Sequence, residues 1–266
     1  SDASHADRHA AGKETCRPDA GRGHLPHRLG HRIEHLPPFA RLYRRAFRSG
    51  ISSPSLVRAA ARLAYYAWDV SGLPRGSIRF SVDVRGTPRS IVADAGNRQY
   101  NVLYFQKYRH AYEPEVSTII STLLPHDGVL YDVGSNWGYF CLMVASSPEF
   151  TGHCHAFEPF PSTYGDLADV VRQAGLEPFV TTHPVAVGDT PKQVVMSGAR
   201  HSGLARVNPD TRRGIEVRQA RLDDLELPPP DLLKVDVEGM EDRVFRGASR
   251  ILADHKPTIV FESTYG

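Results

Sequence analysis

Apolar residues in the second half of the chain recur in short runs, each followed by a turn. These runs occupy residues 129–133, 152–159, 178–187, 232–239 and 258–261. Short apolar runs bounded by turns are typical of strands buried on both faces of a parallel sheet. Helical spacing of apolar residues between them predicts helices over 113–124, 140–145, 161–174 and 241–252, and Gly175 ends the third of these. The pattern predicts an α/β fold built on five core strands.

An insert interrupts this alternation before the fourth core strand. Residues 194–196 and 214–219 have strand-like patterns, and the segment 197–203 between them is polar and rich in glycine. A loop of this kind, placed ahead of a core strand, can cover a site.

The first 111 residues follow other patterns. Residues 1–24 have almost no large apolar side chains and predict a flexible tail. Amphipathic helices are expected over 39–47 and 54–70, followed by strands of a small antiparallel sheet at 77–84, 90–93 and 100–105. We therefore divide the chain into a tail (1–24), a helical and β appendage (25–111) and an α/β domain (112–266).

Three histidines of the appendage, His27, His31 and His35, are spaced four residues apart. On a helix they would share one face, and two of them could hold a metal ion. Prolines on both sides limit such a helix to about two turns. A basic, solvent-facing helix is the favoured interpretation.

Composition narrows the classes of protein. Apolar residues make up 41% of the chain, which is enough for a sizeable core, and no apolar run is long enough to cross a membrane. The three cysteines show no metal-type spacing, so we expect a reducing, cytoplasmic location. Residues 1–79 hold 14 Lys and Arg against 6 Asp and Glu, whereas the remainder holds 18 against 24. Solvated arginines, or arginines paired with the acidic body, explain this basic segment without a nucleic-acid partner.

The turn after the first core strand carries the pattern D-x-G-x-N-x-G, from Asp132 to Gly138. Gly134 and Gly138 allow backbone conformations and close approaches that a side chain would block. A carboxylate and an amide in this turn suit a ligand with an ammonium group and ribose hydroxyls better than a pyrophosphate. S-adenosylmethionine (SAM) is such a ligand. Glu158 ends the second strand, 26 residues after Asp132, close to the spacing at which an acid binds ribose hydroxyls in these folds.

Six motifs in this order resemble the FkbM family of SAM-dependent methyltransferases. They are DVGSNWG (132–138), AFEP (156–159), AVGD (186–189), LDDL (222–225), KVDVEG (234–239) and PTIVFE (257–262). The resemblance implies a Rossmann-like class I methyltransferase sheet and O-methylation of sugars or secondary metabolites. That sheet normally continues with a sixth and a seventh strand, and we expect these C-terminal strands to be missing. The cofactor-binding residues that it implies are Asp132, Gly134, Ser135, Asn136, Gly138, Glu158, Pro159, Ala186 and Val187.

Candidate catalytic residues follow from the fourth strand. Lys234, Asp236 and Glu238 alternate with apolar neighbours, so they face one way, and charges on a core strand are costly unless paired or used. Ligands bind at the carboxyl ends of such strands, which makes Asp236 the first candidate to orient or deprotonate an acceptor hydroxyl. His201, in the glycine-rich loop, is the second candidate. The structural alternative is an ion pair between Lys234 and Asp236.

Two further expectations concern the neighbourhood of this strand. Asp236, Glu238 and Glu262 could instead gather a Mg²⁺-type ion, but no metal site is assigned. Tyr112 and Glu113 are expected near the mouth of the site, by analogy with the fold alone.

The sequence thus predicts a SAM-dependent O-methyltransferase that acts on a hydroxyl of a small molecule. A homo-oligomer is possible. A nicotinamide-dependent Rossmann oxidoreductase is one alternative, disfavoured because G-x-G-x-x-G is missing. A non-catalytic methyltransferase-like binding protein is the other.

Overall fold

The computed structural model describes residues 25–38, 40–41, 76–104, 112–197, 206–207, 214–237 and 239–262. The predicted tail, most of the predicted helices over 39–47 and 54–70, and the loop with His201 lie outside these residues. Those expectations, the division into three parts and the absence of further C-terminal strands stay predictions.

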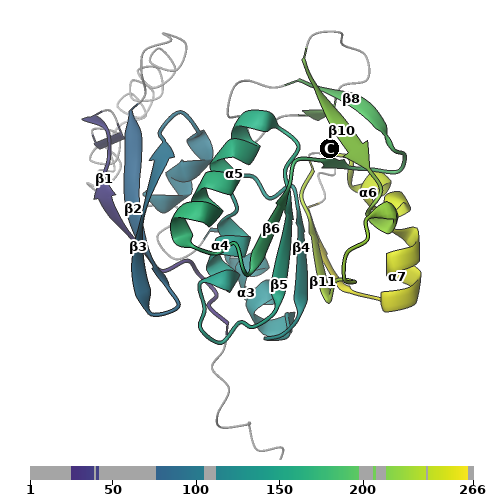
Figure 1. The fold of residues 1–266 in the computed structure, drawn as a ribbon, viewed down its shortest axis with the longest axis horizontal. Helices are drawn as coiled ribbons and strands as arrows, with labels where there is room; N and C mark the ends of the chain where they lie inside the picture. The colour runs from purple at the N-terminus through teal and green to yellow at the C-terminus, as the bar shows by residue number, and fades with distance from the viewer. Residues whose placement is uncertain are drawn as a thin grey trace, which may run out of the picture.

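A five-stranded parallel sheet forms the centre of the structure (Figure 1). Its spatial order is β12-β11-β4-β5-β6. The strands span Val129–Val133 (β4), His153–Phe157 (β5), Val180–His183 (β6), Leu232–Val235 (β11) and Thr258–Phe261 (β12). The order turns outward in both directions from β4, which puts the carboxyl ends of β4 and β11 at a topological switch point. This confirms the predicted α/β fold with a parallel central sheet.

Helices cover both faces of this sheet (Figure 1). One face carries α3 (Pro114–Leu123), α4 (Tyr139–Ala145) and α5 (Pro161–Ala174). The other carries α6 (Glu241–Gly247) and α7 (Ser249–His255). Every residue of α4 is buried, so its position, and that of the turn before it, is fixed by packing on all sides.

A second, antiparallel sheet packs outside α5 (Figure 1). It consists of β1 (His31–His35), β2 (Ser77–Val84) and β3 (Thr87–Asp94). The alternating residues of β2 are buried in the same hydrophobic core as α4 and α5, as the period of two predicts. A third sheet, from the insert, has the order β7-β10-β8-β9 and spans Ala186–Val187 (β7), Lys192–Ser197 (β8), Arg206–Val207 (β9) and Ile215–Ala220 (β10).

Arg85 joins the antiparallel sheet to the α/β body. Its guanidinium donates hydrogen bonds to the carbonyl oxygens of Ser147 and Phe150, both at 2.9 Å, and to that of Pro148 at 3.2 Å. The same guanidinium lies 4.1 Å from the ring centroid of Phe179. A cation at the carboxyl end of α4 also complements the helix dipole. The hairpin between β2 and β3 is therefore held against the body by charge-assisted bonds.

Two expectations for the N-terminal region were wrong. The histidine segment is not a helix, because residues 31–35 form strand β1, in which Ile33 pairs with Phe80 of β2. The edge of a preformed hairpin supplies backbone partners that a two-turn helix lacks. Residues 98–103 form a 3-10 helix (η1, Arg98–Leu103) where a strand over 100–105 was expected. The Asn97 side chain accepts a hydrogen bond from the backbone N–H of Gln99, which starts this turn locally.

Two predicted core elements are each divided in two. The third strand ends at His183, and Pro184, which has no N–H to donate, separates it from β7, which pairs with β10 in another sheet. The helix predicted over 241–252 breaks at Ala248 into α6 and α7.

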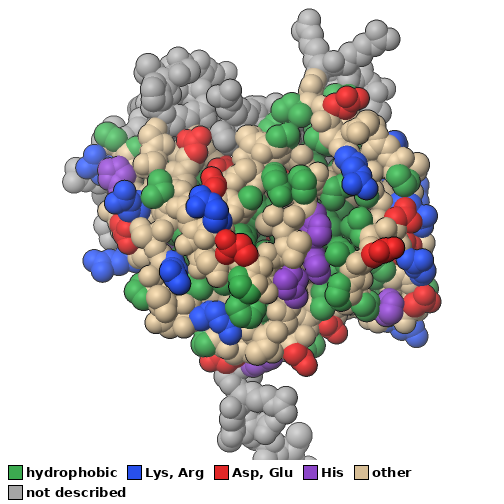
Figure 2. All heavy atoms as spheres, viewed as in Figure 1, with side chains coloured by type: hydrophobic (Ala, Val, Ile, Leu, Met, Phe, Trp, Pro, Cys, Tyr) green, Lys and Arg blue, Asp and Glu red, His purple; other side chains and the backbone are tan. Residues whose placement is uncertain are grey.

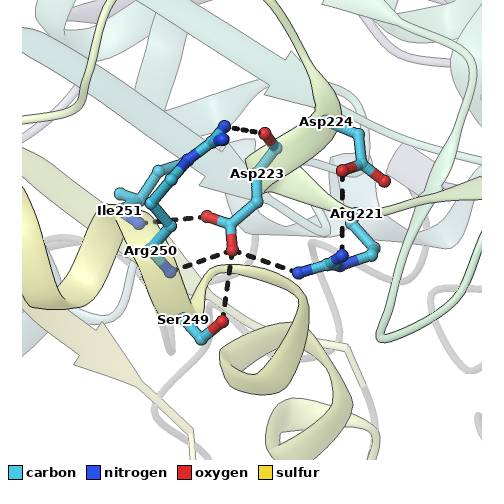
Figure 3. A network of polar contacts seen from close by, with 6 residues as sticks. All are labelled: Arg221, Asp223, Asp224, Ser249, Arg250 and Ile251. Atoms are coloured by element: carbon cyan, nitrogen blue, oxygen red, sulfur yellow. Dashed lines mark hydrogen bonds and ion pairs between the residues drawn. The ribbon is translucent and has the colours of Figure 1, made fainter.

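The break at Ala248 has a clear cause in the Asp223 carboxylate (Figure 3). This carboxylate accepts hydrogen bonds from the backbone N–H groups of Arg250 and Ile251 and from the Ser249 hydroxyl, and it pairs with Arg221. It therefore satisfies free N–H groups in the first turn of α7, which allows a new helix to begin there. The family motif LDDL thus contains a structural residue.

On the face of the molecule shown in Figure 2, acidic and basic side chains are interspersed rather than gathered by sign. Among the described residues, no helix is both long enough and apolar enough to span a bilayer.

Candidate cofactor and acceptor site

A cavity opens at the carboxyl ends of the central strands. The segments that line it include the turn between β4 and α4, the exit of β5, strand β7 and the exit of β11. The predicted site residues that line it are Gly134, Ser135, Asn136, Glu158, Pro159, Ala186, Val187 and Asp236. Residues far apart in sequence thus come together at the switch point, where α/β sheets bind their ligands.

The turn after β4 has the backbone geometry that its glycines suggest. Gly134 has φ +79° and Gly138 has φ +88°. A Cβ on Gly134 would fall onto the carbonyl oxygen of Asp236, so a side chain there would push the exit of β11 away. The N–H groups of Gly134 and Ser135 both donate to the carbonyl oxygen of Phe157 at 3.0 Å, which ties the turn to the exit of β5.

Two of the residues predicted to bind the cofactor, Asp132 and Gly138, lie outside the cavity lining. Asp132 is fully buried and does not line the cavity. Its carboxylate lies 3.1 Å from the Lys234 ammonium on the neighbouring strand, where the two residues are register partners. The Ser135 hydroxyl donates to the Asp132 carbonyl oxygen at 2.6 Å. Gly138 likewise does not line the cavity, and its backbone passes close to Leu167.

Glu158 is the main polar group beside the glycine turn in the cavity lining. One carboxylate oxygen accepts the backbone N–H of Asn136 at 3.1 Å, and the other accepts that of Phe160 at 2.9 Å. Each oxygen keeps a further lone pair for a ligand. Burial raises the pKa of Glu158 to about 7, although the two N–H groups oppose the shift. A ligand that donates hydrogen bonds to this carboxylate would favour its ionised form.

Lys234 lies between the carboxylates of Asp132 and Asp236. Its ammonium lies 3.1 Å from Asp132, 3.7 Å from Asp236 and 5.0 Å from the ring centroid of Phe140. Burial alone would lower the pKa of Lys234, but the carboxylates of Asp132 and Asp236 outweigh it and hold the pKa well above its usual value. The ammonium is therefore charged, and it faces the Asp236 carboxylate, whose side chain is 28% exposed.

The cavity lining includes the two residues expected near the mouth of the site. Tyr112 and Glu113 line the cavity next to Lys234 and Asp236. Glu262 lines it too, and a shallow groove shared by Glu113, Lys234, Asp236 and Glu262 continues from it toward β12. Glu238 and His201 lie outside the described residues. Within those residues, no group of three or more His, Cys, Asp or Glu side chains is arranged to hold a metal ion.

Some lining residues had no signal in the sequence. Gln99 reaches the cavity from η1 of the N-terminal region, and Met196 from the insert. Thr163, in the first turn of α5, lines the cavity with a buried hydroxyl that has no hydrogen-bond partner. A buried hydroxyl without a partner is costly, so it suits a polar ligand atom. Together with the Glu158 carboxylate and the apolar walls of β7, this set fits the ribose and adenine of SAM.

The model of the methyltransferase FkbM domain matches residues 132–266, just over half of the chain. The chain belongs to the FkbM methyltransferase family. The matched segment begins at Asp132, so the glycine turn, Glu158 and Asp236 all lie within the family domain. None of the curated proteins compared with the chain matches it.

Three solved structures are similar to parts of the chain. Methyltransferase FkbM from Methylobacillus flagellatus is 21% identical with a TM-score of 0.42, over 53% of this chain and 34% of that one. Precorrin-6y C5,15-methyltransferase from Geobacter metallireducens is 18% identical with a TM-score of 0.36, over 59% and 64%. A SAM-dependent O-methyltransferase from Thermotoga maritima is 14% identical with a TM-score of 0.31, over 59% and 46%. The match covers less than two thirds of each of these proteins, and family membership rests on the domain match alone.

Proposed function

We propose that this FkbM family protein is a SAM-dependent O-methyltransferase that transfers a methyl group to a hydroxyl of a small molecule, a sugar or a secondary metabolite. The observation that carries the proposal is one cavity lined both by the glycine turn with the Glu158 carboxylate and by Asp236 with Glu113. We call the part lined by the turn and Glu158 the cofactor half and the part lined by Glu113 and Asp236 the acceptor half, and a cofactor and an acceptor that occupy them would meet inside one cavity.

The cofactor half supports binding of SAM through distinct groups. Glu158 accepts hydrogen bonds from the ribose hydroxyls, and the Thr163 hydroxyl offers a further polar contact. Ala186 and Val187 form a small apolar surface for the adenine. Backbone groups of the turn from Gly134 to Asn136 approach the methionine end. Asp132 contributes its charge through Lys234, which it holds in place.

The acceptor half supports alignment of a hydroxyl with the methyl group. When bound, SAM supplies an electrophilic methyl group on a sulfonium. Methyl transfer requires the acceptor oxygen to lie in line with that group at near van der Waals distance. Asp236, fixed by Lys234 and by the bond from its backbone N–H to the Val133 carbonyl oxygen at 2.9 Å, accepts a hydrogen bond from the hydroxyl and orients it. No divalent metal is part of this proposal.

Calorimetric titration of the protein with SAM, S-adenosylhomocysteine and NAD tests the cofactor. The first two should bind with micromolar-type affinity, about −7 to −8 kcal/mol. Heat with NAD but none with SAM or S-adenosylhomocysteine would identify a nicotinamide enzyme instead. Cofactor binding without release of S-adenosylhomocysteine on any alcohol would reject the hydroxyl acceptor, and the same result with nitrogen and carbon acceptors would favour a binding protein.

The Asp236→Asn variant tests the acceptor half. The substitution is nearly isosteric, so cofactor affinity should change little, whereas turnover should fall by about 10²-fold because the hydroxyl loses its orientation. Asp254→Asn, on the exposed surface of α7, is the matched control. A lowered melting temperature with normal turnover would show that Asp236 only neutralises Lys234. Reversal of the loss by added Mg²⁺ would indicate a metal site.

A further inference from the structure

Glu113 has a backbone conformation that its side chain disfavours. It precedes α3 with φ 42° and ψ 69°, in the left-handed region, and makes no capping hydrogen bond with its side chain. Glycine or asparagine would occupy this position with less strain. Strain at a non-glycine residue is a reason to look for a function. Glu113 and Asn136 are the two non-glycine residues of the described cavity lining that have positive φ.

The position of Glu113 puts its carboxylate beside the groups that face an acceptor. It lines both the cavity and the groove that continues from it, together with Lys234 and Asp236. Burial is the largest cause that raises the pKa of Glu113, and the charges of Asp236 and Asp132 raise it further. A hydrogen bond from Tyr112 and the charge of Lys234 lower this pKa, but they do not cancel the increase. Two carboxylates thus face the same space in different environments.

The different environments of the Glu113 and Asp236 carboxylates suit them to different roles. Asp236 lies 3.7 Å from the Lys234 ammonium, and this ion pair holds its carboxylate in place. Glu113 is half-buried, and the raised pKa of its carboxyl makes its carboxylate a stronger proton acceptor than an ordinary exposed one. Pairs of carboxylates with different environments commonly have different roles in one site.

We propose that Glu113 is the catalytic base that removes the acceptor proton, while Asp236, held by Lys234, orients the hydroxyl. This inference rests on the proposed O-methyl transfer. The acceptor oxygen forms a bond to the methyl carbon as the bond between that carbon and the sulfonium sulfur breaks, and the hydroxyl proton passes to a Glu113 carboxylate oxygen. The products are the methyl ether, S-adenosylhomocysteine and a protonated Glu113, which returns its proton to water through the groove.

The test measures release of S-adenosylhomocysteine by wild type and variants with a panel of methyl glycosides and macrolactone alcohols. Glu113→Gln should lower kcat by about 10²-fold or more. Its affinity for S-adenosylhomocysteine should stay within about twofold, because Glu113 lies in the acceptor half. The wild-type kcat should rise with pH through the pKa of Glu113, and this acid limb should be absent in the variant. Glu115→Gln, two residues along and exposed, is the matched control and should behave as wild type.

A second variant separates catalysis from structure. Glu113→Gly removes the carboxylate and also relieves the backbone strain, so it should melt at or above the wild-type temperature and yet be as inactive as Glu113→Gln. Added formate, a small carboxylate, should restore part of its turnover. A Glu113→Gly protein with normal kcat and an unchanged pH profile would overturn the proposal.

Failure of this inference is distinguishable from failure of the proposed function. If the wild type binds S-adenosylhomocysteine and methylates an alcohol while Glu113→Gln retains kcat and the acid limb, only the role of Glu113 is rejected. If the wild type methylates no alcohol in the panel, the hydroxyl acceptor and this inference are rejected together.

Discussion

Replacing Glu158 by glutamine removes the titratable group that we expect to bind the cofactor ribose. Burial raises the pKa of this carboxyl to about 7 in the free protein. Hydroxyls donate best to the ionised form, so binding should lower that pKa. Cofactor affinity of the wild type should therefore rise with pH up to about 7 and then level off, and it should weaken about tenfold for each pH unit below.

The size of the effect depends on pH in a defined way. At pH 8 the wild-type carboxyl is mostly ionised, and Glu158→Gln should bind S-adenosylhomocysteine more weakly by about 1.5–3 kcal/mol, the range for charge-assisted hydrogen bonds. At pH 6 the wild type is itself mostly protonated. The difference between the two proteins should then shrink by about 1.4 kcal/mol, which corresponds to a factor of ten.

Calorimetry of both proteins between pH 5.5 and 8.5 measures this difference. The amino group of the ligand titrates over part of the same range, but it affects both proteins equally and cancels in the comparison. Glu226→Gln, on an exposed side chain, is the matched control. In Glu158→Gln the amide offers one acceptor oxygen to the two N–H groups of Asn136 and Phe160, so melting curves measure the stability lost with the second bond. A difference that stays constant with pH, or no difference at all, would refute the proposed role of Glu158.

Three further predictions concern the framework of the site. Gly134→Ala should lower the free energy of unfolding by at least about 1–2 kcal/mol through the left-handed conformation alone, and the clash with the exit of β11 should lower it further. Gly165→Ala, in α5 with open space around the position, should instead raise the free energy of unfolding by about 0.5–1 kcal/mol. Burial would raise the pKa of Asp223, but the N–H groups at the start of α7 outweigh it and lower the pKa. The stability that Asp223 contributes is therefore present above its unfolded pKa of about 3.9 and is lost as pH falls through the lower folded pKa. Chemical unfolding should show that Asp223→Asn lowers the free energy of unfolding by about 1–3 kcal/mol at pH 7 and by less in acid. Arg85→Ala should cost about 1.5–3 kcal/mol through lost bonds to carbonyl oxygens, and an unchanged unfolding midpoint would contradict the contact between hairpin and body.

Local patterns determined much of the fold in advance. The alternation in β2, the apolar core strands and helix α5 with its terminating Gly175 depend on residues close in sequence, whose periodicity is a property of the chain itself. The glycine turn belongs with these, because its positive φ values restrict it to few residue types. The α/β class and the family could therefore be inferred without coordinates.

Other features were decided only when distant segments packed together. Strand β1 exists because β2 presents a free edge, and the third core strand divides because Pro184 lets the chain pass to another sheet. Asp132 was expected to meet the ligand, but the register of β4 with β11 places it against Lys234, below the cavity.

The acceptor half shows the same limit most clearly. Glu113 precedes Asp236 by more than a hundred residues, and no spacing rule connects them. Gln99 and Thr163 line the cavity from η1 and α5, two elements for which the sequence predicted no role in the site. A sequence pattern records which face of an element is apolar, whereas the environment of a carboxylate depends on burial and on charges brought from other strands. The sequence alone thus predicted most of the residues that line the turn side of the cavity, and the tertiary structure decided which charged groups come together in it.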